Sequence, residues 1–150
     1  MESVNRPNMK YLLFCLVIGV SFIFQSCGNK QVEENKKLRE EVIAVHDEVM
    51  PKMGQLKSFE KTALQMAEDI SKASPMDSVK IQELKNLAAE LDQAYEGMFV
   101  WMRQYDVEDG EKTPEEVKTY LDDQMEKVSK VNQEIKAVLE KAEKSLRSGQ

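Results

Sequence analysis

"KASPMD", residues 72–77, interrupts an otherwise continuous helical pattern and so decides how the chain folds. Ser74 is a preferred residue for a helix N-cap, Pro75 suits the first helical position, and Asp77 falls in the first turn. The stretch therefore predicts that one long helix ends near residue 73 and that a second begins at residue 75. Because the connection is short, we expect the two helices to be antiparallel neighbours.

On both sides of this break, apolar residues recur at steps of three and four, which is the period of a helix with one buried face. No segment alternates at period two over the length of a strand. The predicted core positions of the first helix, at 30–73, are Leu38, Val42, Val45, Val49, Met53, Leu56, Phe59, Ala63, Met66 and Ile70. Those of the second helix, at 75–106, are Ile81, Leu84, Ala88, Leu91, Tyr95, Met98, Met102 and Tyr105.

A second break, "EDGEKTPEE" at residues 108–116, predicts a third helix at 114–148. An Asp–Gly pair favours a turn, and Thr113, Pro114 and Glu116 form a capping box with proline at the first helical position. We therefore expect an all-α fold, an elongated antiparallel three-helix bundle with coiled-coil-like packing. The alternative is a long helical hairpin that oligomerises, but three apolar faces of matched length favour an intramolecular core.

The first 26 residues have the features of a secretory signal peptide. Lys10 precedes an apolar run of about 14 residues, which is shorter than the roughly 20 residues that a membrane-spanning helix needs. The run ends in "FQSC", residues 24–27, which resembles the lipobox of bacterial lipoproteins: an apolar residue three positions before a cysteine and a small residue directly before it. The resemblance implies that Cys27 is lipidated and becomes the mature N-terminus.

Lipidation would anchor the protein in the cell envelope through several acyl chains, palmitate among them, which together hold a protein stably in a membrane. Gly28 follows the cysteine where a retention signal would carry aspartate, which favours the outer membrane. Residues 27–37 are then the lipidated cysteine and a polar tether, and residues 38–150 form the bundle. Cys15 leaves with the signal peptide, so no thiol remains for a disulfide, a zinc site or a nucleophile.

The charge of the chain argues against several classes of function. The 150 residues carry a formal net charge of −6 at pH 7, and removal of the signal peptide changes it to −7. An acidic chain is a poor candidate for binding nucleic acid or an anionic bilayer surface. With one histidine and no free thiol, a nucleophile–base arrangement has few residues to draw on, so we do not expect an enzyme.

"HDEVMPKMG", residues 46–54, holds the only histidine of the chain and a proline that predicts a kink in the first helix. In the antiparallel register this stretch faces "YEGMFVWMRQY", residues 95–105. Carrying the register through the second turn brings Met125 near Tyr95 and Met98. We therefore expect a layer of methionines in the middle of the bundle, with Trp101 beside it.

Two interpretations of this layer stay open. Thioether and imidazole ligands select soft cations, above all Cu(I), and a helical bundle can also hold haem between a histidine and a methionine. Alternatively, the methionines are flexible filling for the uneven core of a kinked helix. The candidate metal ligands are His46, Met50, Met53, Met98 and Met102.

The stretch "HDEVMPKMG" together with the later "WMRQY" is similar to small helical bacterial lipoproteins that are often labelled, for their coiled-coil character, "viral A-type inclusion protein". This resemblance implies the helical fold and the anchor, and it implies no known activity. We therefore expect a lipid-anchored protein of the cell envelope with a non-enzymatic binding or scaffolding role toward an envelope protein. The alternative is a protein that binds Cu(I) or haem.

Overall fold

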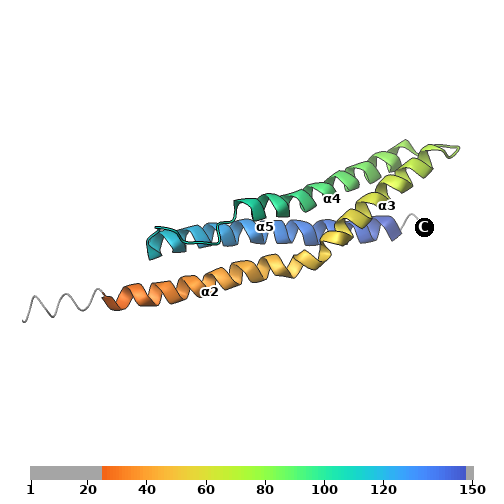
Figure 1. Cartoon of the computed structure of the whole chain (residues 1–150). Helices are drawn as coiled ribbons and strands as arrows, with labels where there is room; N and C mark the ends of the chain where they lie inside the picture. Colours follow the sequence, from red (N-terminus) through yellow and green to blue (C-terminus); the bar gives the residue numbers. More distant parts are fainter. Residues whose placement is uncertain (1–24, 148–150) are drawn as a thin grey trace, which may run out of the picture.

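The computed structural model describes residues 25–147, without the side chains of residues 25–29. Every regular element in this range is helical: α2 (Gln25–Val49), the short 3-10 helix η1 (Met50–Lys52), α3 (Met53–Ser71), α4 (Ser78–Gln104) and α5 (Pro114–Arg147). Figure 1 shows an elongated molecule in which α4 runs back along α3 and α5 then runs in the direction of α2. The expected all-α three-helix bundle is confirmed.

The first long helical segment bends at η1, where Pro51 stands. Proline has no backbone N–H to donate to the carbonyl of Asp47, and its ring crowds that turn. The chain passes through one tighter turn, in which the Met53 N–H donates to the carbonyl oxygen of Met50. The predicted kink is confirmed, and it divides the segment between two partners, since α2 packs mainly on α5 and α3 mainly on α4 (Figure 1).

Side chains cap the two later helices. The Asp77 carboxylate accepts a hydrogen bond from the Lys80 N–H at 2.9 Å and begins α4. The N-cap predicted at Ser74 is therefore wrong, because residues 72–77 form the connection. The capping box of α5 is confirmed: the Thr113 N–H donates to Glu116 Oε2 at 2.8 Å, and the Glu116 N–H donates to Thr113 Oγ1 at 3.3 Å.

The segment expected to be a polar tether is part of α2. Asn35 is buried, and its Nδ2 donates to the carbonyl oxygen of Pro114 at 2.7 Å, which fastens this segment to the start of α5. The polar composition of this segment gives no sign of the contact, because one buried amide that has a hydrogen-bond partner is enough to hold the segment against α5. Residues 1–24, which include most of the predicted signal peptide, and the side chain of Cys27 lie outside the described residues. No helix in the described range is long and apolar enough to cross a membrane.

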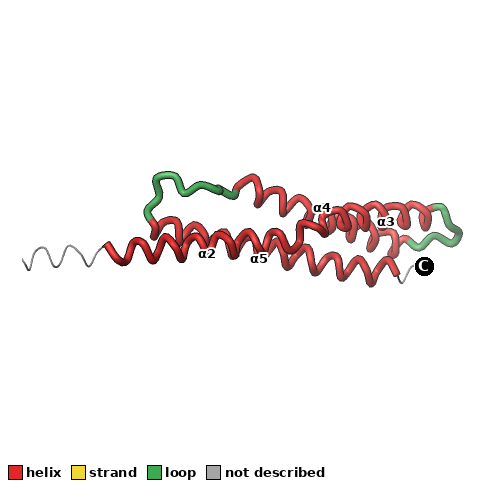
Figure 2. The backbone as a smooth tube through the Cα atoms, turned by 60° about the horizontal axis from the view of Figure 1, so that its bottom comes forward, coloured by secondary structure: helices red, strands yellow, loops and turns green. Residues whose placement is uncertain are grey.

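The core runs along the axis of the bundle and draws on α2, α3, α4 and α5. Its largest fully buried side chains are Leu56, Leu84, Leu87, Leu91, Met98, Leu121, Ile135, Val42, Val49 and Val128. Each such side chain contributes about 1.5–3 kcal/mol when it is removed from water. The two connections, residues 72–77 and 105–113, lie at opposite ends of the molecule (Figure 2), so the described chain has two distinct ends.

Candidate functional site

The histidine of α2 contacts the tryptophan in the last turn of α4, at the open end of the chain's first hairpin. The ring centroids of His46 and Trp101 lie 5.5 Å apart, with the planes tilted by 34°. Further along α3, Lys57 Nζ lies 2.9 Å from Asp92 Oδ1. Both pairs fit the predicted antiparallel register of the first two helical segments, which is confirmed.

The register predicted for the third helix is wrong. Lys141 Nζ pairs with both carboxylate oxygens of Glu90, at 2.7 and 2.6 Å. The part of α5 that faces Tyr95 therefore lies roughly two to three turns beyond Met125. The cause is the connection at 105–113, which is not helical and displaces α5 along α4.

The structure separates the five candidate metal ligands by burial. Met53 and Met98 are buried in the core, and Met50 and His46 are half-buried. Met102 is 38% exposed, so its predicted place in the apolar face is wrong. Met102 and Trp101 both lie about one turn after Met98, and the larger aromatic side chain takes the buried position, with 5% exposure.

Two ring nitrogens at the His46–Trp101 contact are buried without a hydrogen-bond partner in the described part of the chain: Nε2 of His46 and Nε1 of Trp101. The other nitrogen of the histidine, Nδ1, lies 2.8 Å from Asp47 Oδ1. A carboxylate only accepts hydrogen bonds, so in the neutral imidazole this nitrogen carries the proton and Nε2 keeps a free lone pair. A buried polar atom without a partner costs about 1–3 kcal/mol, which marks this contact as unusual.

A row of aromatic rings continues from this contact toward the second connection. The centroids of Trp101 and Tyr105 lie 4.9 Å apart, and those of Tyr105 and Tyr120 lie 6.2 Å apart. Ring pairs at these separations stabilise a fold beyond the area that they bury. Burial raises the pKa of the Tyr105 phenol above its ordinary value. The row therefore anchors the end of α4 to the start of α5.

Arg39 ties the second connection to α2. Its Nη1 donates to the hydroxyl of Tyr105 at 3.3 Å and to the carbonyl oxygen of Asp106 at 3.2 Å, and its Nη2 pairs with the carboxylate of Asp109. The connection at 105–113 is thus held by one guanidinium that reaches three of its residues. Sequence reasoning gave Arg39 no role, because its partners lie far away in the chain.

A polar clamp, formed by Asn132, Glu48 and Lys136, joins α5 to α2 just before the kink. Asn132 is 4% exposed, and its Nδ2 donates to the carbonyl oxygen of Val45 at 2.8 Å and to Glu48 Oε2 at 3.0 Å. Lys136 Nζ donates to Glu48 Oε1 at 2.6 Å. Both oxygens of the glutamate are therefore occupied. The only trace of the clamp in the sequence is an asparagine at a helical phase where apolar residues are expected.

The clamp predicts a pH dependence of stability. The hydrogen bonds from Lys136 and then Asn132 hold the pKa of Glu48 below its ordinary value of 4.5. The unfolded chain therefore binds more protons than the folded one just below that value, so the contribution of Glu48 is present above it and is lost as the pH falls through the folded-state pKa. Glu48→Gln should flatten the fall in unfolding free energy between about pH 5 and pH 3, measured by urea denaturation at each pH. Lys136→Gln should flatten it too, and native slopes in both variants would contradict the assignment.

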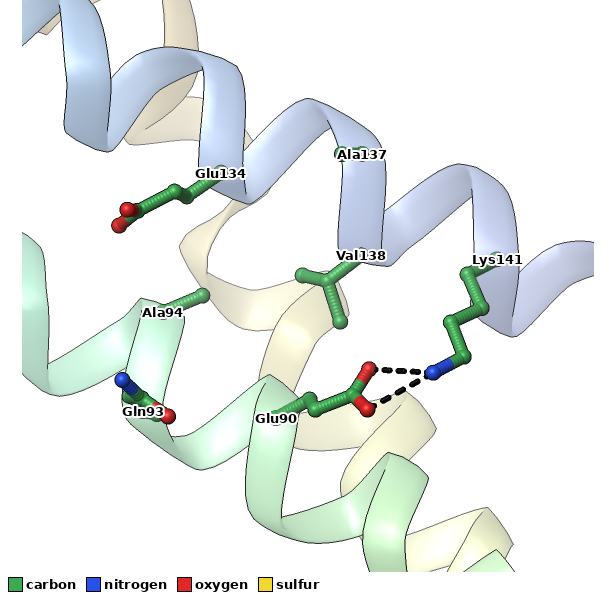
Figure 3. Close-up of a pocket in the computed structure, with 7 residues that line it drawn as sticks. All are labelled: Glu90, Gln93, Ala94, Glu134, Ala137, Val138 and Lys141. Carbon is green, nitrogen blue, oxygen red and sulfur yellow. Dashed lines mark hydrogen bonds and ion pairs between the residues drawn. The ribbon is translucent and has the colours of Figure 1, made fainter. Parts of the chain in front are cut away.

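A groove of about 340 Å³ runs between α4 and α5. Figure 3 shows Glu90 reaching across it to Lys141, with the side chains of Ala94 and Val138 pointing into the space between the two helices. An adjoining hollow of about 410 Å³ continues the groove as far as Lys80. Small apolar residues at the floor and charges at the rim are suited to contact with another surface, and they do not form a nucleophile–base pair.

Residues 25–147 contain no group of three or more His, Cys, Asp or Glu side chains placed to hold a metal ion, in so far as their side chains are described. Compared with known proteins, the chain matches no family model, no curated protein and no solved structure. The resemblance to lipobox-bearing helical lipoproteins therefore stays a prediction.

Proposed function

We propose that this chain is a lipid-anchored protein of the cell envelope, held in the outer membrane through Cys27, with a non-enzymatic binding or scaffolding role. In this proposal the bundle is a stiff rod that presents its surface to an envelope protein. The support comes from the lipobox-like stretch at residues 24–27, taken together with the way in which the N-terminal helix enters the bundle.

The observation that carries the proposal is the continuity of α2. In the described residues, α2 continues without a break from Gln25 to Val49, so the backbone of Cys27 belongs to the rod itself. The connection at 72–77 lies at the other end of the molecule (Figure 2). Residues 25–71 are helical throughout and correspond to about 70 Å of helical rise. A lipid on Cys27 would therefore hold one end of the rod at the membrane and place the other end well away from it.

The far end and the groove are the surfaces best suited to a partner. Met76 and Val79, at and beside the connection, are 58% and 69% exposed. Exposed apolar side chains rimmed by polar residues are common where another protein binds. The α4–α5 groove opens on the side of the same rod, and its rim carries both acidic and basic groups (Figure 3).

The anchor can be tested with a matched pair of cysteine variants. Cys27→Ala should abolish lipidation and signal cleavage at this site, so the mass of the N-terminal peptide should no longer include acyl chains. Cys15→Ala, which changes the other cysteine, should leave the lipidated N-terminus intact. Mass spectrometry and membrane fractionation provide the measurement. An acylated N-terminus in Cys27→Ala, or an unmodified Cys27 in the native protein, would refute the anchor.

A further inference from the structure

We infer that His46, Met50 and Met98 form a binding site for Cu(I), with the face of Trp101 beside it. This inference is independent of the lipid anchor. It begins with the unpartnered nitrogens: a buried Nε2 lone pair on His46 next to a tryptophan that is itself 5% exposed and has an unpartnered N–H. A lone pair that is withdrawn from water and accepts no hydrogen bond is available to a metal ion.

The two methionines lie close to this ring contact along their own helical segments. Met50 follows His46 by four residues and Met98 precedes Trp101 by three, so each lies about one helical turn from the ring contact and on the same side of it. The His46–Trp101 contact and the Lys57–Asp92 pair lie on either side of Met50 and Met98 along the two segments, so these two methionines fall at about the same level of the bundle. Both methionines pack in or against the same core cluster.

The bend at Pro51 is what brings Met50 into this position. In a straight helix, the phase of residue 50 would point its side chain away from the apolar face that contains Val42 and Val49. In the structure Met50 begins the 3-10 turn and packs against the core. The proline therefore adds a sulfur to a place where an unbent helix would have none.

The chemistry of the donors selects the ion. Two thioethers and one neutral imidazole are soft ligands that favour Cu(I), whereas divalent hard cations need the carboxylate groups that the described residues do not assemble here. The indole face of Trp101 attracts a cation at close range. The Asp47 carboxylate holds Nδ1–H of His46, an arrangement that commonly orients a metal-binding histidine.

The size of the site favours a single ion over haem. Met98 is fully buried and Trp101 nearly so, and core side chains occupy the interior at this level. The way in from solvent is the edge of the bundle, where the side chain of His46 is 15% exposed and Met50 is half-buried. Met102, at 38% exposure, faces away and is left out of the ligand set.

The test is an anaerobic titration of the full chain, in mild detergent with the N-terminus that it carries, with Cu(I) in competition with a colorimetric Cu(I) chelator. Trp101 is the only tryptophan, so its emission reports on this site alone. We expect one Cu(I) per chain and an emission change that saturates at the same ratio. Met50→Leu and Met98→Leu should each weaken binding by at least about tenfold, and His46→Gln more; Asp47→Asn should cost about tenfold.

Methionine-to-leucine changes nearly conserve volume, so these variants should fold, and thermal melts monitor this directly. Met66→Leu, on α3, and Met102→Leu are matched controls that each remove one sulfur and should leave the affinity unchanged. Equal affinity in the native chain and in a Met50→Leu, Met98→Leu double variant would overturn the inference. Binding without any change in Trp101 emission would also overturn it, since the copper would then be adventitious.

Discussion

Replacing Trp101 by alanine is expected to lower the free energy of unfolding by about 3–5 kcal/mol. The indole is 5% exposed and contacts the rings of His46 and Tyr105, so its removal leaves a cavity where α2, α4 and the aromatic row meet. The deleted atoms lose their transfer free energy, and the surrounding helices can collapse only partly into the space. Urea denaturation, followed by far-ultraviolet circular dichroism, measures the change.

Two companion variants make this prediction specific to the buried ring. Val100→Ala, at the preceding position, removes a side chain that is 42% exposed and should change the unfolding free energy by no more than about 0.5 kcal/mol. Trp101→Phe should cost much less than Trp101→Ala, because it keeps an aromatic ring and removes an N–H that has no partner in the described structure. Similar losses in all three variants would contradict the described packing of Trp101.

Asn132→Asp should lower the unfolding free energy by about 3 kcal/mol at neutral pH. The substitution keeps the shape of the side chain but exchanges the amide donor for a carboxylate. The new group then faces two acceptors, the carbonyl oxygen of Val45 and the carboxylate of Glu48, from a position that is 4% exposed. Two hydrogen bonds are lost, and a negative charge is buried beside the exposed carboxylate of Glu48.

The loss caused by Asn132→Asp should shrink as the pH falls. Burial and Glu48 would raise the pKa of the new carboxyl in the folded state above its unfolded value, so the folded variant gains protons first. Once protonated, the group again has a hydrogen to donate. Gln133→Glu, which adds the same charge at the neighbouring exposed position, is the control and should show little loss. A loss that is equal in both variants, or independent of pH, would contradict the clamp.

Local signals predicted most of the helical architecture. The helix before the first connection, the capping box at Thr113 and the kink at Pro51 depend on residues that are neighbours in the chain, so their chemistry can be read directly. The register of the first hairpin could also be predicted, because its connection is short. The register of α5 could not be predicted, because residues 105–113 are not helical and their path is fixed by contacts with Arg39.

The candidate site could be predicted only in outline. The predicted register placed His46 in the same layer as Trp101, but Met102 was assigned to the buried face of its helix in place of Trp101, since both lie about one turn from Met98. The inward position of Met50 depends on the bend at Pro51, whose direction no residue pattern specifies. The role of Asn132 depends on a partner 87 residues away in the chain, which no local pattern indicates.

The bend at η1 is a joint between two helical arms, α2 and α3. Beyond it, α3 is an arm of about 28 Å, so a change of about 10° in the bend would carry its far end by about 5 Å. Because α4 is packed along α3, such a movement would carry the whole tip at residues 72–77 with it. The candidate ligands His46 and Met50 lie at this bend. A small displacement of their backbone would therefore become a large displacement of the connection at residues 72–77.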